Sequence, residues 1–483
     1  MRLFFIEWGG KQFGMTDIVR KLKEHGHEIV YWSGPNLDHH INRSEFPGTI
    51  FHDHFDALFC RPAPEVDASG CIPPGGELIK SLAEVESETL TMMSKLFETM
   101  QVNERKHLYY RYLGYWKGVL EKYRPDAIIF PNVPHTVYDF VLYSLAKKRG
   151  IRILLFELTR INDRSLLISD MVKGSAALKK ELVRNRGKNF TLDDLPDDVQ
   201  VYYKGQMGEK AGSHPKDIVD LLGRYSGLSA LRIKLHSFWT TITVHRDLSV
   251  FGKILTYVPR RLRENQRTEY KRVMQELDFK KPFIYVPLQY QPEATTSPLG
   301  GVFVDQLLML EILSAALPAG WELYVKEHPL QWKPRSPDYF SYRYRGYYAR
   351  IAALRGVRVI PIETPSLSLI LQSACVASVN GTAGWEALLK GKPSLIFGHA
   401  WYRDCPGVFK IDDYATCKKA FEAIQCGYRV HAPQIINYLY SFGKISMNGF
   451  REQYCRDVSF IDVSQNIRNH VLAIETAFKS DDL

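Results

Sequence analysis

The chain has 483 residues, of which 45% are hydrophobic and 24% are charged. This length exceeds the roughly 250 to 300 residues at which a single core stops growing, so we expect a globular protein with more than one domain. We expect no membrane-spanning helix, because no segment approaches the ~18 consecutive apolar residues that such a helix requires. The formal net charge of +10 favours an anionic partner, which is a nucleotide, an acidic glycan, an anionic bilayer or a nucleic acid.

The start of the chain and its cysteines indicate a cytoplasmic protein. Residues 1–7 are typical of a strand and lack the apolar stretch and the small-residue cleavage site of a signal peptide. The seven cysteines are scattered, odd in number and never spaced as Cys-x-x-Cys, which argues against a disulfide framework or a zinc knuckle. We expect them to be reduced thiols.

The amino-terminal part of the chain alternates predicted strands and helices. The pattern predicts strands at 2–6, 28–32, 125–131 and 151–156, and helices at 16–24, 87–123 and 136–149. Parallel strands joined by helical crossovers form a doubly wound layer. We therefore expect a Rossmann-like first domain.

Residues 170–280 have a less regular pattern. Within them, residues 257–272 are basic with interleaved aromatic side chains, which fits a nucleic-acid arm, a membrane-surface helix or a solvated helix face. The glutamates in this segment favour the solvated face. We place the end of the first domain at residue 275.

From residue 283 onward the alternation is regular again. The predicted strands lie at 283–289, 321–327, 357–360, 375–379 and 394–397, and the predicted helices at 302–317, 347–355, 366–373 and 383–390. These elements predict a second doubly wound domain over 276–460, followed by a carboxyl-terminal helix within 461–483. The expected fold class is α/β, with domains 1–275 and 276–460.

Two polar side chains share one face at the carboxyl end of the strand at 321–327. Because side chains alternate along a strand, Lys326 and His328 point one way and Glu327 points the other. Lys326 supplies a point charge and His328 can donate a hydrogen bond, so the pair predicts a phosphate site. A histidine held by a local carbonyl fits the same pattern equally well.

The segment Asn380-Gly-Thr-Ala-Gly384 opens the helix that follows the strand at 375–379. The first turn of a helix has unpaired backbone amides and a positive dipole end, so a phosphate fits beside Gly381 and Thr382, with Thr382 as the expected cap. Glu386, one turn further on, can accept hydrogen bonds from ribose hydroxyls. A plain strand-to-helix turn and an exposed helix carboxylate are the alternatives.

Three polar side chains, Gln289, Gln291 and Glu293, follow the strand at 283–289. They share one face if the strand continues, and they are suited to binding a donor sugar or a base edge. Capping and turn roles explain them nearly as well.

The first-domain strand at 151–156 ends in a segment that contains Glu157, Asp163 and Arg164. Carboxylates beside arginines at the carboxyl end of a strand are placed for nucleophilic or general-base catalysis. Glu157 and Asp163 are therefore the candidate catalytic groups, joined by His135 from the neighbouring strand exit, and Arg164 is assigned to the donor sugar. A salt-bridged loop is the alternative.

We expect neither a metal nor a cofactor. The segments Asp38-His-His40 and His52-Asp-His-Phe-Asp56 lack a helical His-x-x-x-His pattern or an open tetrahedral set of ligands. Gly9, Gly10 and Gly14 form only a partial dinucleotide fingerprint, and no acidic residue ends the strand at 28–32.

The motifs Gln291-Pro-Glu293, Lys326-Glu-His-Pro329 and Asn380-Gly-Thr-Ala-Gly-Trp-Glu386 resemble those of bacterial capsule polysaccharide biosynthesis proteins, which include β-Kdo transferases of the GT-B architecture. The resemblance covers mainly residues 283–400. It implies two Rossmann-like domains that face an interdomain cleft, with a CMP-activated ulosonic acid such as CMP-Kdo as the donor. The His-Pro pair also resembles the motif by which GT-B sialyltransferases hold the phosphate of a CMP-sugar.

Carried over by residue, the resemblance implies that His328 binds the donor phosphate with help from Asn380 and Thr382. It also implies that the last helix crosses back to the first domain. The retaining Kdo enzymes use a carboxylate within an acidic-acidic-glycine segment after a first-domain strand. Glu157-Leu-Thr159 has neither the second acid nor the glycine, and the paired serines of the sialyltransferase site are absent.

The leading hypothesis is a metal-independent glycosyltransferase that moves a CMP-linked Kdo-like sugar onto a surface glycan or a lipid-linked glycan. A nucleotide-sugar epimerase of the UDP-N-acetylglucosamine 2-epimerase type is the second hypothesis. The third is a non-catalytic binder of anionic surfaces that uses the basic segment 260–272. Peripheral contact with an anionic membrane is a further expectation, whereas nucleic acid is not an expected partner.

Overall fold

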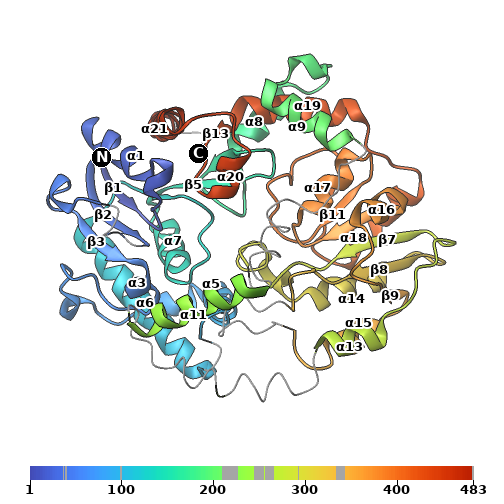
Figure 1. Ribbon diagram of the computed structural model, residues 1–483, viewed down its shortest axis with the longest axis horizontal. Helices are drawn as coiled ribbons and strands as arrows, with labels where there is room; N and C mark the ends of the chain where they lie inside the picture. Colours follow the sequence, from blue (N-terminus) through green and yellow to red (C-terminus); the bar gives the residue numbers. More distant parts are fainter. Residues whose placement is uncertain are drawn as a thin grey trace. The chain divides into compact units, whose positions relative to one another are not determined.

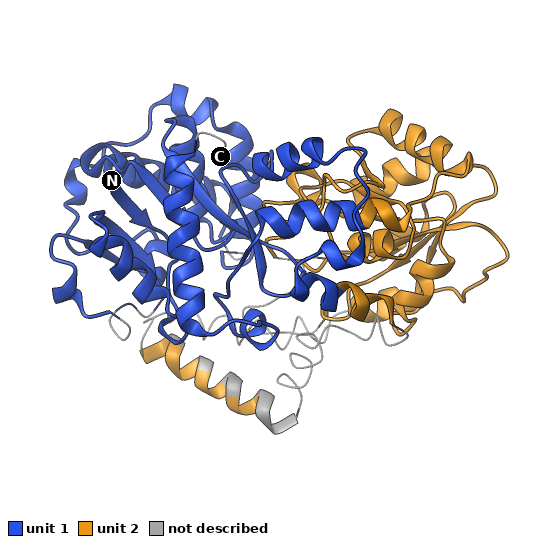
Figure 2. Cartoon of the chain, turned by 90° about the horizontal axis from the view of Figure 1, so that it is seen from above, with its two compact units in different colours: residues 1–202, 436–483 blue, residues 203–435 orange. Residues whose placement is uncertain are grey.

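A computed structural model describes residues 1–35, 37, 41–97, 100–208, 227–243, 255, 266–291, 293–332 and 343–480. The chain divides into two compact units (Figure 2). Unit 1 comprises Met1–Tyr202 and Ile436–Leu483, and unit 2 comprises Tyr203–Ile435. These bounds differ from the expected domains 1–275, 276–460 and 461–483. Unit 2 begins at Tyr203 instead of residue 276, and the chain returns to unit 1 at Ile436 instead of residue 461.

Unit 1 contains a seven-stranded sheet in the order β13-β6-β5-β4-β1-β2-β3. Its strands are β1 (Arg2–Phe5), β2 (Glu28–Gly34), β3 (Ile50–Asp53), β4 (Ala127–Phe130), β5 (Arg152–Leu158), β6 (Arg164–Ile168) and β13 (Met447–Asn448). Strands β1 to β5 run parallel, and β6 runs antiparallel to β5. The chain builds β1, β2 and β3 in one direction and then adds β4 on the other side of β1, so the topological switch point lies between β1 and β4.

Helices cover both faces of this sheet (Figure 1). The helices of unit 1 are α1 (Met15–Glu24), α3 (His54–Leu58), α4 (Gly76–Lys80), α5 (Ala83–Met93), α6 (Val102–Tyr123), α7 (Tyr138–Lys148), α8 (Ala176–Arg184), α20 (Gln453–Asp457) and α21 (Val463–Lys479), while α9 (Asp197–Met207) and α19 (Ala432–Ile445) span the unit bounds. Leu3 and Phe5 pack into the cluster shared by α1 and α21. The intervening Phe4 lies on the opposite face beside Tyr31, whose ring contacts Trp116 of α6.

The single helix predicted over 87–123 is in fact two helices, α5 and α6. Helix α6 begins after Gln101, whose side chain accepts from the third helical amide while Glu104 accepts from the Gln101 backbone amide. This capping box satisfies two amides at the start of a new helix and so separates it from the Met-rich helix before it. Neither this break nor the strands β3, β6 and β13 were predicted from the sequence pattern.

Unit 2 contains a six-stranded, fully parallel sheet in the order β12-β11-β10-β7-β8-β9. Its strands are β7 (Phe283–Pro287), β8 (Glu322–Lys326), β9 (Val357–Val359), β10 (Cys375–Ser378), β11 (Ser394–Ile396) and β12 (Val408–Lys410). Its helices are α11 (Gly227–Thr243), α13 (Gln266–Val273), α14 (Gln306–Ala316), α15 (Tyr347–Ala352), α16 (Ser366–Gln372), α17 (Thr382–Leu389) and α18 (Tyr414–Gln425). The switch point lies between β7 and β10, because the chain adds β8 and β9 on one side of β7 and β10 to β12 on the other.

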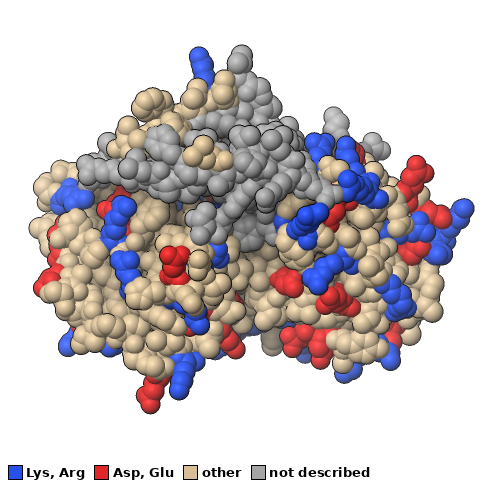
Figure 3. Space-filling model, turned by 90° about the horizontal axis from the view of Figure 1, so that it is seen from below, with Lys and Arg blue, Asp and Glu red and all other residues tan. Residues whose placement is uncertain are grey.

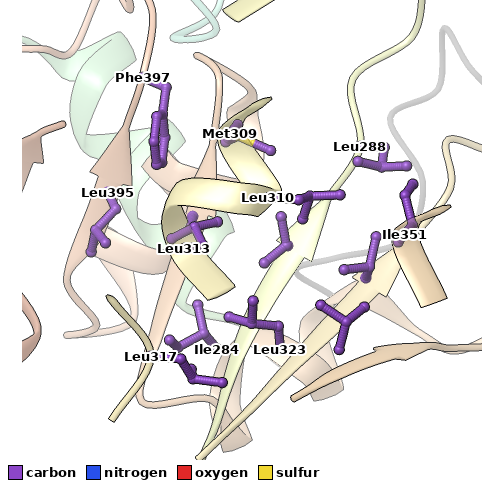
Figure 4. Packing of buried hydrophobic residues seen from close by; sticks show 14 of the residues in the cluster. Ile284, Leu288, Met309, Leu310, Leu313, Leu317, Leu323, Ile351, Leu395 and Phe397 are labelled. Atoms are coloured by element: carbon purple, nitrogen blue, oxygen red, sulfur yellow. The ribbon is translucent and has the colours of Figure 1, made fainter. Parts of the chain in front are cut away.

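The two faces of the second sheet bury alternate residues of each strand. Ile284 and Val286 face the larger core, where Met309, Leu310 and Leu313 of α14 pack (Figure 4). The alternate positions Phe283 and Tyr285 face a smaller core under α16 and α17. These two layers, together with unit 1, confirm the predicted α/β fold of two Rossmann-like domains, whereas a cleft between them stays a prediction.

The helix predicted at 302–317 begins later than expected. A 3-10 turn occupies Gly301–Val304, and α14 starts after Asp305, whose carboxylate accepts the Leu307 amide. The seven cysteines are free thiols, in agreement with the sequence analysis. Among the described residues, no helix is both long and apolar enough to cross a membrane.

The contact between α21 and the start of α1 gives a stability prediction. Gly14 has φ 75°, and a Cβ at this position would lie 2.6 Å from Ile467 Cγ1 of α21. Gly14→Ala should lower the free energy of unfolding by roughly 1–3 kcal/mol or more through backbone strain together with this collision. Gly26→Ala is the matched control, since Gly26 has φ 88° but nothing within 4 Å of its Cβ position. Equal losses in chemical denaturation would contradict a role for the α1–α21 contact.

Candidate functional site

The candidate site in unit 2 lies at the switch point of its sheet, where open α/β sheets bind their ligands. Gln289 follows β7 and Asn380 follows β10, and these two strands are neighbours. A Cβ at Gly381 would collide with the Gln289 side-chain amide, so the two strand exits are in direct contact. Gln289 and Gly381 are thus brought together as the sequence analysis expected.

Helix α17 begins at this point without a side-chain cap. Its cap residue is Gly381, in an extended conformation, and Thr382 is the first helical residue. The prediction of Thr382 as the cap is therefore wrong, because the turn is one residue shorter than the sequence pattern indicated. Glycine has no side chain to accept from the first-turn amides. The Gly384 amide donates to the Gly381 carbonyl at 3.1 Å, and the amides of Thr382 and Ala383 are available to an anionic ligand.

Asn380 is buried beside this helix terminus. Its side chain is 7% exposed, and neither Oδ1 nor Nδ2 bonds to any residue in the described part of the chain. A buried polar group left unsatisfied costs about 1–3 kcal/mol. Such a cost is typical of a side chain that is completed by a ligand.

His328 presents a defined donor at the end of β8. Its Nδ1 accepts the Leu330 backbone amide at 3.2 Å, and its ring lies 5.4 Å from that of Tyr290. Because Nδ1 acts as an acceptor, the neutral ring carries its proton on Nε2. The local partner is an amide rather than the carbonyl considered from the sequence, and it fixes His328 as a donor.

Lys326 points toward α16, whereas Glu327 bonds to Tyr348 of α15, so these two side chains lie on opposite faces as predicted. Lys326 Nζ donates to the Thr364 carbonyl at 2.8 Å and to Ser366 Oγ at 2.7 Å. Burial lowers the pKa of Lys326 to about 8, against the opposing effect of the Glu386 carboxylate. The ammonium is therefore directed into the protein, where its charge acts on Glu386.

Glu386 lies on α17 in a partly buried position. Burial raises its pKa to about 7, although Lys326 and Lys390 both favour the carboxylate. The side chain is thus near its titration midpoint at neutral pH, which distinguishes it from the exposed helix carboxylate considered as the alternative.

The remaining donor-sugar candidates serve the loops that follow β7. Because β7 ends at Pro287, the idea that Gln289, Gln291 and Glu293 share one face of a continuing strand is wrong. Gln291 is buried, with Nε2 bonded to the Val304 carbonyl and Oε1 accepting from Gln306 and Arg343. The Glu293 carbonyl accepts the amides of the next turn.

A buried ion pair that the sequence analysis missed holds the end of β8. Glu327 is fully buried and receives Arg343 Nε at 2.8 Å, Arg343 Nη2 at 3.1 Å and the Tyr348 hydroxyl at 2.6 Å. Glu327 Oε1 also accepts the backbone amide of His328 at 2.7 Å. The only signal in the sequence was a carboxylate on the buried face of a strand, which requires a partner that local spacing does not identify.

In unit 1, Asp163 and Arg164 have structural partners. Asp163 is fully buried and accepts Asn448 Nδ2 at 3.0 Å and Ser459 Oγ at 2.7 Å. Arg164 donates to both carboxylate oxygens of Asp198, at 2.6 and 2.8 Å. This is the salt-bridged loop that was the alternative for these two residues.

Glu157 and His135 lie at the carboxyl edge of the first sheet. Glu157 is in β5 and 3% exposed. His135 Nδ1 bonds to the Val133 carbonyl at 2.7 Å, and the His135 amide donates to Asp139 at the start of α7. The two carboxylates differ in their surroundings, because Asp163 bonds to Asn448 beside β13 and to Ser459.

The structure gives the histidine-rich segments no metal-ligand arrangement within the residues it describes. No group of three or more His, Cys, Asp or Glu side chains in that part of the chain is arranged to hold a metal ion. His52 bonds to the Tyr31 hydroxyl at 2.6 Å and to the Arg61 carbonyl at 2.8 Å. Asp38, His39 and His40 lie outside the described residues.

Comparison with protein families defines the class of this part of the chain. Residues 237–420 match the family model of capsule polysaccharide biosynthesis proteins. This segment contains the β7, β8 and β10 strand exits, and its match to the capsule polysaccharide biosynthesis family confirms the resemblance drawn from the motifs. Comparison with curated proteins gives no match.

Solved structures similar to this chain include two bacterial transferases and an epimerase. A Thermosulfurimonas dismutans KpsC, β-Kdo 2,7 transferase, is 12% identical with a TM-score of 0.34, covering 79% of this chain and 94% of that one. The β-Kdo 2,4 transferase of the same KpsC has 12% identity and a TM-score of 0.33 over 67% and 82%. The UDP-GlcNAc 2-epimerase of Neisseria meningitidis has 11% identity and a TM-score of 0.24 over 99% and 100%.

The buried pair beside His328 gives a prediction. Arg343→Met should destabilise the protein by about 3–5 kcal/mol, because it leaves the Glu327 carboxylate buried and uncompensated. The double variant Arg343→Met with Glu327→Gln should recover part of this loss. Arg358→Met is the control, since its pair with Glu322 is partly exposed and should cost about 0–1 kcal/mol. Chemical denaturation measures all four proteins, and equal losses for Arg343→Met and Arg358→Met would contradict the assignment.

Proposed function

We propose that this protein is a glycosyltransferase whose unit 2 binds a nucleotide-activated sugar. The observation that carries the proposal is the buried Asn380, which has no hydrogen-bond partner among the described residues and lies beside the uncapped amino-terminus of α17. A diphosphate or monophosphate group at this point would accept from the first-turn amides and from Asn380 Nδ2. The family match of residues 237–420 supports a role in making a surface polysaccharide.

For the donor we propose a CMP-linked ulosonic acid such as CMP-Kdo, transferred to a glycan or a lipid-linked glycan. The capsule polysaccharide family of this segment and its His328-Pro329 pair support this choice. His328 Nε2 and the α17 amides would stabilise the charge that develops on the departing phosphate, with Lys326 as a buried cation behind them. These donors supply the electrostatic stabilisation that a metal-independent transferase requires.

Removal of the hydrogen-bonding groups of Asn380 should weaken nucleotide binding without lowering the stability of the protein. Asn380→Leu keeps a similar shape, so the free energy of unfolding without ligand should stay constant or rise. Binding of CMP should weaken by roughly ten- to a hundredfold, because a hydrogen bond to a charged group contributes about 1.5–3 kcal/mol. Thermal shift with CMP, UDP, GDP, ADP and NAD measures the change, and His328→Ala should weaken the response to the same nucleotide.

The control for these variants is His431→Ala, because His431 is an exposed histidine of unit 2. A response to UDP instead of CMP would move the donor to a UDP-sugar. A product formed from that sugar nucleotide without any acceptor would identify the epimerase activity. No response to any nucleotide would overturn the phosphate site.

For peripheral contact with an anionic membrane, we propose helix α11. Leu231, Leu235 and Trp239 recur every four residues along it and are 55%, 52% and 61% exposed. Residues four apart lie on one face of a helix, and such an apolar stripe in a cationic chain is typical of interfacial helices. On the face shown in Figure 3, the Lys and Arg of the described residues are interspersed with Asp and Glu and form no separate basic patch. The apolar stripe of α11 is therefore a more specific indication of membrane contact than the net charge. Residues 257–265 of the basic segment lie outside the described residues.

Liposome flotation tests this contact. The wild type should float with vesicles that contain anionic lipid, and the double variant Leu235→Gln, Trp239→Gln should lose most of this binding. The control is Phe460→Gln with Leu472→Gln, which changes two exposed apolar side chains of unit 1 that are 62% and 67% exposed. Absence of flotation by the wild type would remove the membrane from the expected partners.

A further inference from the structure

A buried tyrosine that the proposed function does not use contacts the amino-terminus of α17. Tyr402 follows β11, which is the neighbour of β10 in the second sheet, and it is fully buried. Its hydroxyl donates to the Gly381 carbonyl at 2.7 Å. Because Gly381 is the cap residue of α17, this hydrogen bond joins the loop after β11 to the candidate phosphate site.

Helix α17 has a glycine where the tyrosine hydroxyl approaches it. A Cβ at Gly384 would lie 2.3 Å from Tyr402 Oη and 2.4 Å from Ser394 Oγ, so a larger residue would displace the hydroxyl. Glycine is less favourable than alanine in the interior of a helix, and here it provides the space that the phenol occupies. The motif Asn380-Gly-Thr-Ala-Gly384 thus has one glycine at the cap and a second that admits Tyr402.

The position and the protonation of the Tyr402 side chain are both fixed. Its ring lies 6.1 Å from that of Trp385 in α17 and 5.4 Å from that of Trp401. Burial raises the pKa of Tyr402, against the opposing effect of the Ser378 and Ser394 hydroxyls. The phenol therefore remains protonated at neutral pH and acts as a donor to the Gly381 carbonyl.

Gly381 needs an external restraint because of its residue type. It has φ −70° and ψ 160°, a conformation open to any residue, but a Cβ would lie 2.3 Å from Gln289 Nε2, so the space beside Gln289 requires glycine. Glycine has more backbone freedom than any other residue and loses more of it on folding. The hydrogen bond from Tyr402 restricts Gly381 to one of its accessible conformations.

The bond to the Gly381 carbonyl also determines where the next amide points. A peptide group is planar and trans, so its C=O and its N–H point in opposite directions. The Gly381 carbonyl points toward the buried Tyr402 hydroxyl, and the Thr382 amide of the same peptide group therefore points away from it. The Gly384 amide donates to the same carbonyl at 3.1 Å, so two donors hold this peptide group.

We propose that Tyr402 is a positioning residue of the phosphate site, which orients the Thr382 amide toward the donor phosphate through the Gly381 carbonyl. This inference rests on the proposed function and adds a residue to its phosphate site. Tyr402 acts on the nucleotide only through the peptide group between Gly381 and Thr382, and all three residues belong to unit 2. Donors that are already oriented need no ordering when the ligand binds, so loss of the Tyr402 hydroxyl weakens nucleotide binding.

The test compares Tyr402→Phe with Tyr324→Phe. Tyr324 is the matched control, because it is a fully buried tyrosine of the same unit whose hydroxyl donates to the Asp278 carbonyl. Each variant loses one hydroxyl that donates to a backbone carbonyl, so both should lower the midpoint of chemical denaturation by a similar amount. Only Tyr402→Phe should raise the Kd for CMP, or for UDP if the wild type responds to UDP, by roughly tenfold in isothermal titration calorimetry.

Two further variants distinguish positioning from a merely structural role. Gly384→Ala keeps the phenol but displaces its hydroxyl, while alanine favours the helix, so this variant should raise the Kd by a similar factor. Replacement of Tyr402 by 4-aminophenylalanine keeps the shape of the side chain and an N–H donor at the end of the ring. This variant should recover most of the wild-type affinity, because the donor that holds the Gly381 carbonyl is retained.

Each outcome supports or overturns the role of Tyr402. Wild-type affinity in Tyr402→Phe would overturn it and leave the proposed function standing, and so would an equal loss of affinity in Tyr324→Phe. If Tyr402→Phe does not fold, the affinity of Gly384→Ala decides in the same way. A wild type that binds no nucleotide would instead overturn the proposed function, and the role of Tyr402 with it.

Discussion

Parallel strands that are joined by crossover helices all end at the same edge of their sheet, and the candidate site of this protein depends on that constraint. Each exit must change direction between a strand and a helix, so backbone amides and polar side chains gather there. At the switch point the two crossovers diverge, and no helix covers the edge between them. Gln289 with Asn380 in unit 2, and Glu7 with Tyr138 in unit 1, lie at these two positions.

The two units satisfy their buried polar groups in different ways. Glu327 is fully buried but receives two nitrogens of Arg343 and a tyrosine hydroxyl, so its charge stabilises the end of β8. Asn380, two strands away in the same sheet, has no such partner among the residues that the structure describes. The difference separates a side chain that completes the fold from one that, in the function we propose, a ligand would complete. Burial of a polar residue therefore does not by itself distinguish a structural role from a binding role; its hydrogen-bond partners must be known as well.

The sequence predicted most strongly periodic elements of both sheets, because amphipathic helices and apolar strands carry their pattern locally. It also located the strand ends at His328 and Asn380, because polar residues that follow an apolar strand can be recognised from the sequence alone. It missed β3, β6 and β13, which are short or antiparallel additions, and it missed the break before α6.

The partners of Glu327 and Glu7 could not be predicted, for a common reason. Arg343 follows Glu327 by 16 residues, and Tyr138 follows Glu7 by 131. Such pairs form because strand order brings their exits together, and strand order is not encoded in local spacing. The partners of Asp163 and Arg164 could not be predicted either, since Asn448 and Asp198 come from distant segments.

Helix α21 has a consequence for the order in which the protein matures during synthesis. Val471, Ile474 and Ala477 of this helix are part of the core that α1 and the first strands share. Unit 1 therefore lacks a wall of its core until residues near 480 have left the ribosome, although its first strand is made at the outset. Unit 2, which ends at Ile435, is available as a complete segment earlier. The core of unit 1 is therefore completed after that of unit 2, and the apolar residues that α21 will cover stay exposed in the interval.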